Sequence, residues 1–218
     1  MQQKFKTILL FGAPGCGKGT QGKMLGTLPG YVHVSSGDMF RALDRTSELG
    51  KIFMEYSTKG LLVPDDFTIR LWRDHMTKLV SSGKVQPGSD VVILDGIPRN
   101  VDQARMLDEH IQVTKLIVLR AFHDRAEMVR RLKSRALKEN RPDDADEATI
   151  QRRLEVYDKE SRPVVEYYPK SVRVDVDALQ TPIEVAHDIL CAVLGRTNEL
   201  RAIPPTASSG RASPRTER

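Results

Sequence analysis

The sequence predicts an α/β fold built on a parallel sheet, and three observations support that prediction. Short aliphatic runs recur between longer stretches of helical composition. Two of these runs, residues 91–94 and 116–119, are unbroken, which is typical of parallel strands covered by helices on both faces. A glycine-rich segment follows the first aliphatic run of the chain, at residues 6–11, and precedes a helical stretch. Strands that alternate with helices are joined by right-handed crossovers, so ligands are expected at the carboxyl ends of the strands.

Five strands are expected, in chain order, at residues 6–11, 31–34, 90–95, 115–119 and 172–176. Two further segments are predicted to be insertions at the carboxyl edge of the sheet. Residues 35–64 have helical composition, whereas residues 136–148 are polar and contain few apolar side chains. The chain is therefore predicted to form one domain, residues 1–198, with a basic tail at 199–218 whose composition predicts disorder.

The segment from Gly12 to Thr20, Gly-Ala-Pro-Gly-Cys-Gly-Lys-Gly-Thr, has the composition of a phosphate-binding loop. Glycines let the backbone turn closely enough for successive N–H groups to face anionic oxygens, and Pro14 stiffens a position that needs no donor. The following helix adds the positive end of its dipole, and Lys18 adds a mobile cation. A glycine-rich turn without a ligand is the alternative, and the lysine argues against it. The loop therefore predicts binding of a nucleotide's phosphates, by an ATPase, a GTPase or a small-molecule kinase.

Composition and charge exclude several other classes of protein. The chain has 218 residues, 39% of them hydrophobic, and no apolar run long enough to span a membrane. Its two cysteines lack metal-ligand spacing, which predicts free thiols in a cytoplasmic protein. Residues 201–218 contribute +3 of the net charge of +5. The folded part therefore has little excess charge, which argues against nucleic acid as a partner.

A second candidate group follows the strand predicted at residues 90–95. Asp95 ends this strand, and Gly-Ile-Pro-Arg follows at residues 96–99. A carboxylate at the carboxyl edge, beside the phosphate loop, suits a magnesium ion bound through water. An aspartate that caps a turn is the common alternative. Arg99 favours the magnesium interpretation because a guanidinium group binds phosphate oxygens in bidentate geometry.

Several motifs together resemble those of the adenylate kinases and related nucleoside monophosphate kinases. The loop shares the family's order, in which a glycine separates the lysine from the threonine. Residues 35–41, Ser-Ser-Gly-Asp-Met-Phe-Arg, resemble its monophosphate-site signature, and residues 94–99 followed by Gln103 resemble its second signature. The family's lid arginines are matched by Arg131, Arg135, Arg141 and Arg153. The resemblance covers residues 5–195 in consistent order.

This resemblance implies a P-loop nucleoside triphosphate hydrolase-like fold, with a five-stranded parallel sheet and helices on both faces. Residues 35–64 would bind the nucleoside monophosphate, and residues 136–148 would form a short lid. The implied reaction is reversible phosphoryl transfer from Mg-ATP to AMP, which gives two ADP. A short lid without cysteines implies that no zinc is bound. The resemblance also leads us to expect a cytoplasmic monomer.

The site residues implied by the resemblance fall into four groups. Catalysis would be carried by Lys18, Arg99, Arg135, Arg141 and Arg153. ATP would be bound by Gly12, Pro14, Gly15, Cys16, Gly17, Lys18, Gly19, Thr20 and Arg131. AMP would be bound by Ser36, Arg41, Val63, Gly96, Arg99, Gln103, Arg141 and Arg153, with Gln103 reading the adenine edge. Asp95 would hold Mg²⁺ through water. For each arginine, the alternative is a solvated charge on a helix face.

Departures from the family pattern leave alternatives open. Asn100 follows Arg99, as it does in UMP/CMP kinases, whereas Ser36 and Gln103 favour AMP. A UMP/CMP kinase or a broader nucleoside monophosphate kinase is therefore an alternative. A non-catalytic nucleotide-binding switch protein is an alternative from a different class. The lid is one residue longer than usual, so Arg152 is an alternative to Arg153.

Overall fold

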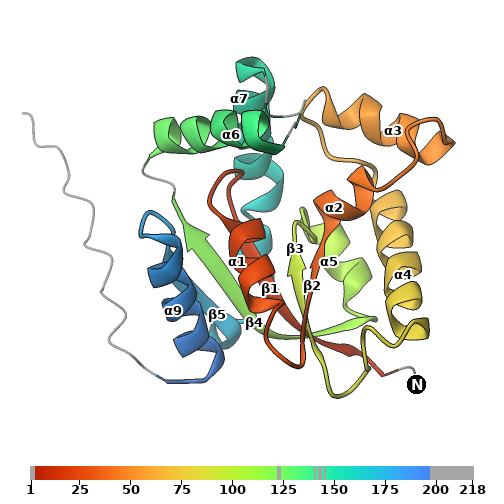
Figure 1. Ribbon diagram of the computed structural model, residues 1–218, viewed down its shortest axis with the longest axis vertical. Helices are drawn as coiled ribbons and strands as arrows, with labels where there is room; N and C mark the ends of the chain where they lie inside the picture. The colour runs from red at the N-terminus through yellow and green to blue at the C-terminus, as the bar shows by residue number, and fades with distance from the viewer. Residues whose placement is uncertain (1–2, 122–123, 140, 142–143, 145, 197–218) are drawn as a thin grey trace, which may run out of the picture.

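Five parallel strands form the central sheet of the computed structural model, which describes residues 3–121, 124–139, 141, 144 and 146–196 (Figure 1). The strands are β1 (Phe5–Gly12), β2 (Tyr31–Ser35), β3 (Val91–Asp95), β4 (Ile111–Arg120) and β5 (Arg173–Asp177). Their order across the sheet is β2-β3-β1-β4-β5, and all neighbouring pairs are parallel. The predicted five-stranded parallel sheet is confirmed.

Strand β4 begins at Ile111, four residues before the predicted start. Its first residues pair with the first residues of β1, and the register then shifts at Thr114, which has no partner on β1. The Thr114 hydroxyl donates a hydrogen bond to the carbonyl of Thr7 at 3.0 Å. Polar residues at alternate positions interrupt the apolar run at this end of the strand. The pairing with β1 extends the strand beyond the run that marked it in the sequence.

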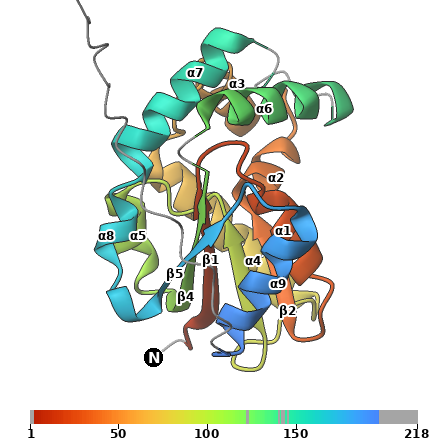
Figure 2. The same cartoon turned by 90° about the vertical axis from the view of Figure 1, so that its left-hand side faces the viewer.

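Helices cover both faces of the sheet (Figure 2). Helices α1 (Lys18–Leu25) and α9 (Pro182–Val193) pack together on one face. On the other face lie α5 (Val101–Leu107) and α8 (Val164–Tyr167), with α4 (Asp65–Ser81) packed against α5. The middle residues of β3 and β4 are consequently buried, and Ile93, Leu94 and Ile117 are 0% exposed. A π-helical turn, η2 (Tyr157–Ser161), and a 3₁₀ turn, η3 (Lys170–Val172), complete the region before β5.

The remaining helices lie above the carboxyl ends of the strands (Figures 1 and 2). Helices α2 (Ser36–Arg41) and α3 (Glu48–Ser57) occupy the insertion expected at residues 35–64. Helices α6 (Arg125–Glu139) and α7 (Glu147–Val156) extend into the two ends of the segment predicted to be the lid. Part of that segment and the tail expected at residues 199–218 lie outside the described residues. None of the described helices combines the length and apolar character needed to cross a membrane.

Capping side chains fix where several of these helices begin. Helices α2, α3, α5 and α7 each follow a residue whose side-chain oxygen accepts a hydrogen bond from the backbone N–H three residues further on. These capping residues are Ser35, Ser47, Asn100 and Asp146, respectively. Helix α9 begins with a capping box between Thr181 and Glu184. Such caps satisfy N–H groups that have no partner within the helix. Helix α1 differs, because it follows Gly17 and has no side-chain cap. Its first N–H groups therefore face the phosphate loop without a competing side chain.

Candidate active site

The glycine-rich loop joins β1 to α1 at the carboxyl edge of the sheet. Gly12 has a φ of 145°, and a Cβ at this position would lie 2.7 Å from both the Leu119 carbonyl oxygen and the Cys16 Sγ. Gly17 has a φ of 102°, which L side chains rarely adopt, and it directly precedes the first helical residue. Space requires glycine at the first position, and backbone conformation favours it at the second. The loop geometry is therefore specified by the glycines that mark it in the sequence.

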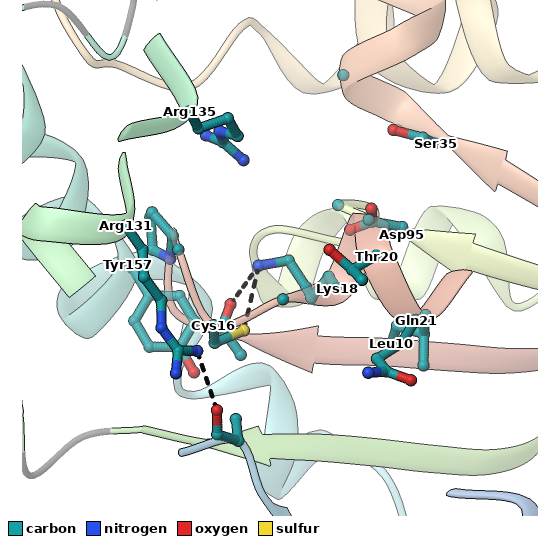
Figure 3. A pocket seen from close by; sticks show the side chains of 18 of the residues that line it. Leu10, Cys16, Lys18, Thr20, Gln21, Ser35, Asp95, Arg131, Arg135 and Tyr157 are labelled. Carbon is teal, nitrogen blue, oxygen red and sulfur yellow. Dashed lines mark hydrogen bonds between the residues drawn. The ribbon is translucent and has the colours of Figure 1, made fainter. Parts of the chain in front are cut away.

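Lys18 reaches back across this loop (Figure 3). Its Nζ donates hydrogen bonds to the carbonyls of Gly12 at 2.7 Å and Ala13 at 3.0 Å, and it lies 3.8 Å from the Cys16 Sγ. The Cys16 side chain is buried beneath the loop, with 2% of the residue exposed. The positive charge is thus held beside the N–H groups at the start of α1. This combination suits an anionic ligand.

Two adjoining hollows open above the sheet edge, a larger one of about 620 Å³ and a smaller one of about 70 Å³. The larger is lined by ten lysine and arginine side chains and by four aspartate and glutamate side chains. This surplus of positive charge suits a ligand with several phosphate groups. Every residue that the sequence analysis assigned to nucleotide, catalysis or metal lines at least one hollow. Of these residues, only Val63 and Gln103 line the smaller hollow alone.

Two of the expected lid arginines share one buried carboxylate. Arg135 on α6 donates through Nε to Asp144 Oδ2 at 2.7 Å, and Arg153 on α7 pairs with the other oxygen of Asp144. The Asp144 side chain is 0% exposed. One carboxylate therefore holds guanidinium groups from two helices over the larger hollow. Asp144 had no predicted role, and its place three residues after Arg141 was the only signal for it in the sequence.

The structure also distinguishes Arg153 from Arg152, the alternative to it in the sequence. Arg153 lines both hollows, whereas Arg152 lines neither. Arg141 lines the larger hollow and donates through Nε to Glu139 at 2.7 Å. The residue that the resemblance favoured is thus the one that faces the cleft.

Arg131 on α6 lies on the opposite side of Lys18 from Asp95 (Figure 3). It donates through Nε to Glu127 at 2.8 Å and through Nη1 to the carbonyl of Ala178 at 3.0 Å. Hydrogen bonds from Arg130 and Arg131 lower the pKa of Glu127 from its usual 4.5 to about 2. The carboxylate therefore remains ionised at neutral pH, and it holds the Arg131 side chain beside Ala178.

Two further arginines lie where the hollows join. Arg41 donates to Asp38 Oδ1 at 2.6 Å, and Arg99 donates through Nε to the carbonyl of Gly96 at 2.9 Å. Both arginines line both hollows. Ser36 is 1% exposed, and its hydroxyl donates to the same Gly96 carbonyl at 2.7 Å. The backbone after β3 thus anchors a guanidinium group and a hydroxyl group side by side.

The smaller hollow combines an apolar wall with a buried amide. The rings of Phe40 and Phe53 stack with their centroids 5.1 Å apart and 10° between their planes. Both line the hollow together with Val63 and Gln103. Apolar walls with a few placed polar groups are typical of sites for small organic ligands. The two phenylalanines were not predicted from the sequence, because their pairing requires α2 and α3 to be placed side by side.

The donor atoms around Asp95 fit a hard cation. Asp95 is 8% exposed, and no described residue donates a hydrogen bond to its carboxylate. Its Oδ2 lies 3.8 Å from His33 Nε2, and Thr20 lies beside it in Figure 3. Carboxylate and hydroxyl oxygens suit Mg²⁺, which usually retains several water ligands. Within the described ranges, no group of three or more His, Cys, Asp or Glu side chains could hold a metal directly.

A parallel sheet of this order, with a phosphate loop and arginines from two insertions around one cleft, defines an enzyme of the P-loop class that acts on phosphate groups. The family model for adenylate kinase matches residues 10–173. The chain belongs to the adenylate kinase family. The predicted family, fold class and phosphotransferase activity are therefore confirmed. The alternative of a non-catalytic switch protein is set aside.

Individual relatives agree with this assignment over most of their length. An adenylate kinase of Thermobifida fusca (strain YX) is 38% identical over an alignment of 194 residues that covers 87% of this chain and 98% of the relative. An adenylate kinase of Maricaulis maris (strain MCS10) is 37% identical over 193 residues, which cover 85% of this chain and 97% of the relative. An adenylate kinase of Streptomyces coelicolor is 33% identical over 210 residues, with 81% of this chain and 93% of the relative covered.

Proposed function

We propose that this enzyme transfers the terminal phosphoryl group of Mg-ATP to AMP, with ATP at the phosphate loop and AMP at the smaller hollow. The observation that carries this proposal is the junction of the two hollows, which share Arg41, Arg99 and Arg153. Phosphates bound from the two sides would meet there. The names of the relatives support the same pair of nucleotides. A cytoplasmic location and a monomeric state stay predictions from the sequence.

On the donor side, the phosphates of ATP would lie against the loop N–H groups and Lys18. The Lys18 ammonium group, now bonded to two loop carbonyls, would exchange those bonds for phosphate oxygens. Arg131 would lie against the adenine ring, because its guanidinium group is anchored beside Ala178. Asp95 would hold Mg²⁺ through water. When bound, that ion neutralises charge on the nucleotide phosphates.

On the acceptor side, Arg41 and Arg99 would hold the phosphate of AMP. Gln103 would read the base in the smaller hollow, against Val63 and the stacked phenylalanines. AMP is also predicted to contact Ser36 and Gly96, which are joined by the hydrogen bond from the Ser36 hydroxyl to the Gly96 carbonyl. The guanidinium groups of Arg135, Arg141 and Arg153 would surround the phosphoryl group during transfer.

This set of residues needs no general base. The acceptor is a phosphate, already anionic at neutral pH, so no proton must be removed before attack. The enzyme must instead bring two anions together and neutralise the charge that spreads over the transferred group. Fixed guanidinium groups do this at small reorganisation cost, because the buried Asp144 carboxylate already holds two of them.

Water is the competing acceptor, so the two insertions must exclude it during transfer. The first insertion already touches α7, the helix that continues the second, because the Thr149 hydroxyl at the start of α7 donates to the carbonyl of Thr58 at 3.3 Å. Gly60 lies under the same helix, where a Cβ would approach the Thr149 carbonyl to 3.0 Å. We propose that the segments 35–64 and 136–148 act as the monophosphate-binding insertion and the short lid.

The proposal is tested by phosphoryl transfer from Mg-ATP to AMP, CMP, UMP and GMP, with a control that contains no acceptor. ADP formation that is fastest with AMP, and slow with GMP and UMP, is the expected result. A preference for CMP or UMP would support the pyrimidine alternative that Asn100 suggests. ADP formation without an acceptor would show that the cleft admits water and would contradict the proposed exclusion.

A further inference from the structure

We infer that Asp65, which lines neither hollow, determines the choice of acceptor base by fixing the orientation of the Gln103 amide. The inference rests on the proposed role of Gln103 as the base reader. Asp65 is the first residue of α4 and directly follows the segment that carries Val63. It would be a positioning residue, acting on the substrate through Gln103.

The orientation of the Gln103 amide follows from its two protein partners. Gln103 is 1% exposed; its Nε2 donates to Asp65 Oδ1 at 2.8 Å, and its Oε1 accepts the Arg99 backbone N–H at 2.8 Å. An ionised carboxylate can only accept a hydrogen bond, and a backbone N–H can only donate one. Reversing the amide would set two acceptors against each other at Asp65 and two donors at Arg99. The amide nitrogen and oxygen therefore have one stable order.

Asn100 holds Asp65 in place for this purpose. Its Nδ2 donates to both oxygens of Asp65, at 2.9 and 3.0 Å. Its Oδ1 accepts the backbone N–H of Gln103 at 2.7 Å and so caps α5. Both ends of the Asn100 amide are thus engaged within the protein, and Asn100 lines neither hollow. Asn100, which suggested a pyrimidine kinase in the sequence, thus supports the proposed base reader Gln103 from outside both hollows.

The fixed amide has one N–H and one oxygen lone pair left for a ligand. Adenine complements this pair with a ring-nitrogen acceptor beside an exocyclic amino donor, and cytosine has the same pattern. Guanine and uracil have a carbonyl acceptor beside a ring N–H, so they need the reversed amide. A phosphate anchored at Arg99 would limit how the base can turn to compensate. The site would therefore select amino-substituted over oxo-substituted bases, and Asp65 would enforce that selection.

The test compares Asp65→Asn with the matched control Asp66→Asn. Asp66 is the next residue in the first turn of α4, and it is exposed. An amide at position 65 can donate as well as accept, which releases the order of the Gln103 amide. We expect the ratio of kcat/KM for AMP to that for GMP to fall about tenfold in Asp65→Asn, with an unchanged KM for ATP. Asp66→Asn should keep the wild-type ratio.

A second variant protects the test against loss of folding. Asn100→Ser keeps a side-chain oxygen to cap α5 but removes the donor that holds Asp65. It should lower the same ratio by a smaller factor, of about threefold. Thermal unfolding of each variant shows whether it is folded under assay conditions.

Base selectivity distinguishes positioning from a structural role. Equal losses with AMP and GMP, or a ratio in Asp65→Asn equal to that in Asp66→Asn, would overturn the inference. If Asp65→Asn did not fold, an unchanged ratio in Asn100→Ser would overturn it instead. Failure of the proposed function would look different, because the wild-type enzyme itself would then show no preference for AMP over GMP.

Discussion

The phosphate loop and the acceptor hollow are built in opposite ways. Nine consecutive residues form the loop, and its binding groups are backbone N–H groups whose directions are set by glycines at three positions of positive φ and by the start of α1. The smaller hollow is assembled from α2, α3, the segment 60–63, α4, the turn after β3, α5 and α7. Two of its polar side chains, those of Gln103 and Arg153, are held by Asp65 and Asp144, which line neither hollow. The loop is therefore specified locally, whereas the hollow depends on contacts between distant segments.

The largest effect on the acceptor hollow is expected for Arg99→Lys, which retains the positive charge but removes the planar guanidinium group. Arg99 is anchored by a backbone carbonyl, and its guanidinium group would bind phosphate. We expect kcat to fall about 100-fold, because an ammonium group cannot reproduce the bidentate contact. Arg105→Lys is the matched control on α5, the helix that follows Arg99, since Arg105 is a surface residue paired with Asp102. A folded Arg99→Lys enzyme with near-normal turnover would remove Arg99 from the proposed role.

How far the sequence could predict each region follows from this difference. Glycine, lysine and helix start are contiguous, so Lys18 and its neighbours could be assigned before the fold was known. Asp144 and Asp65 could not be, because their function lies in a pairing across helices rather than in a spacing. Asn100 illustrates the limit well: its identity suggested a different base, and only its bonds to Asp65 explain it.

Asp144→Asn tests the assembled region through stability. Removing one negative charge leaves Arg135 and Arg153 close together around a neutral amide that is fully buried. We expect the free energy of unfolding to drop by about 2 kcal/mol, less than for a completely buried ion pair because the arginines are partly exposed. Turnover should also fall about tenfold. Urea denaturation and steady-state assays measure the two effects.

Asp158→Asn is the matched control, since Asp158 pairs with Arg125 on the surface. Its expected cost is within about 0.5 kcal/mol, as for other exposed ion pairs. Equal costs for the two variants would mean that Asp144 does not organise the lid arginines.

Gly22 extends the comparison to the helix that follows the loop. A Cβ on Gly22 would lie 2.3 Å from the Nε2 of His33 on β2, so the glycine is required by a segment eleven residues away. We expect Gly22→Ala to lower the free energy of unfolding by about 1–2 kcal/mol because His33 must move. In a His33→Ala background the same change should be neutral or stabilising, because alanine favours helix. The same cost in both backgrounds would exclude the clash as its cause.

The smallest effect is expected at Arg131, because it is held by both a side chain and a backbone carbonyl. Glu127→Gln weakens the first contact, while the bond to the Ala178 carbonyl remains. The KM for ATP should therefore rise only about threefold, with no change in the KM for AMP. Glu55→Gln, at a surface pair on α3, is the control.

The pH dependence of Glu127→Gln gives a second, independent readout. Hydrogen bonds from Arg130 and Arg131 depress the folded-state pKa of Glu127 from 4.5 to about 2, so they favour its ionised form. A depressed pKa contributes stability that is fully present above the unfolded-state pKa and is lost as the pH falls through the folded-state pKa. The stability difference between wild type and Glu127→Gln should thus be constant from neutral pH to about pH 5.5 and shrink below about pH 4.5. Urea midpoints measured across this range would contradict the pairing if the difference stayed constant throughout. In that case Arg131 would depend on the backbone carbonyl alone, and its placement would belong with the locally specified loop.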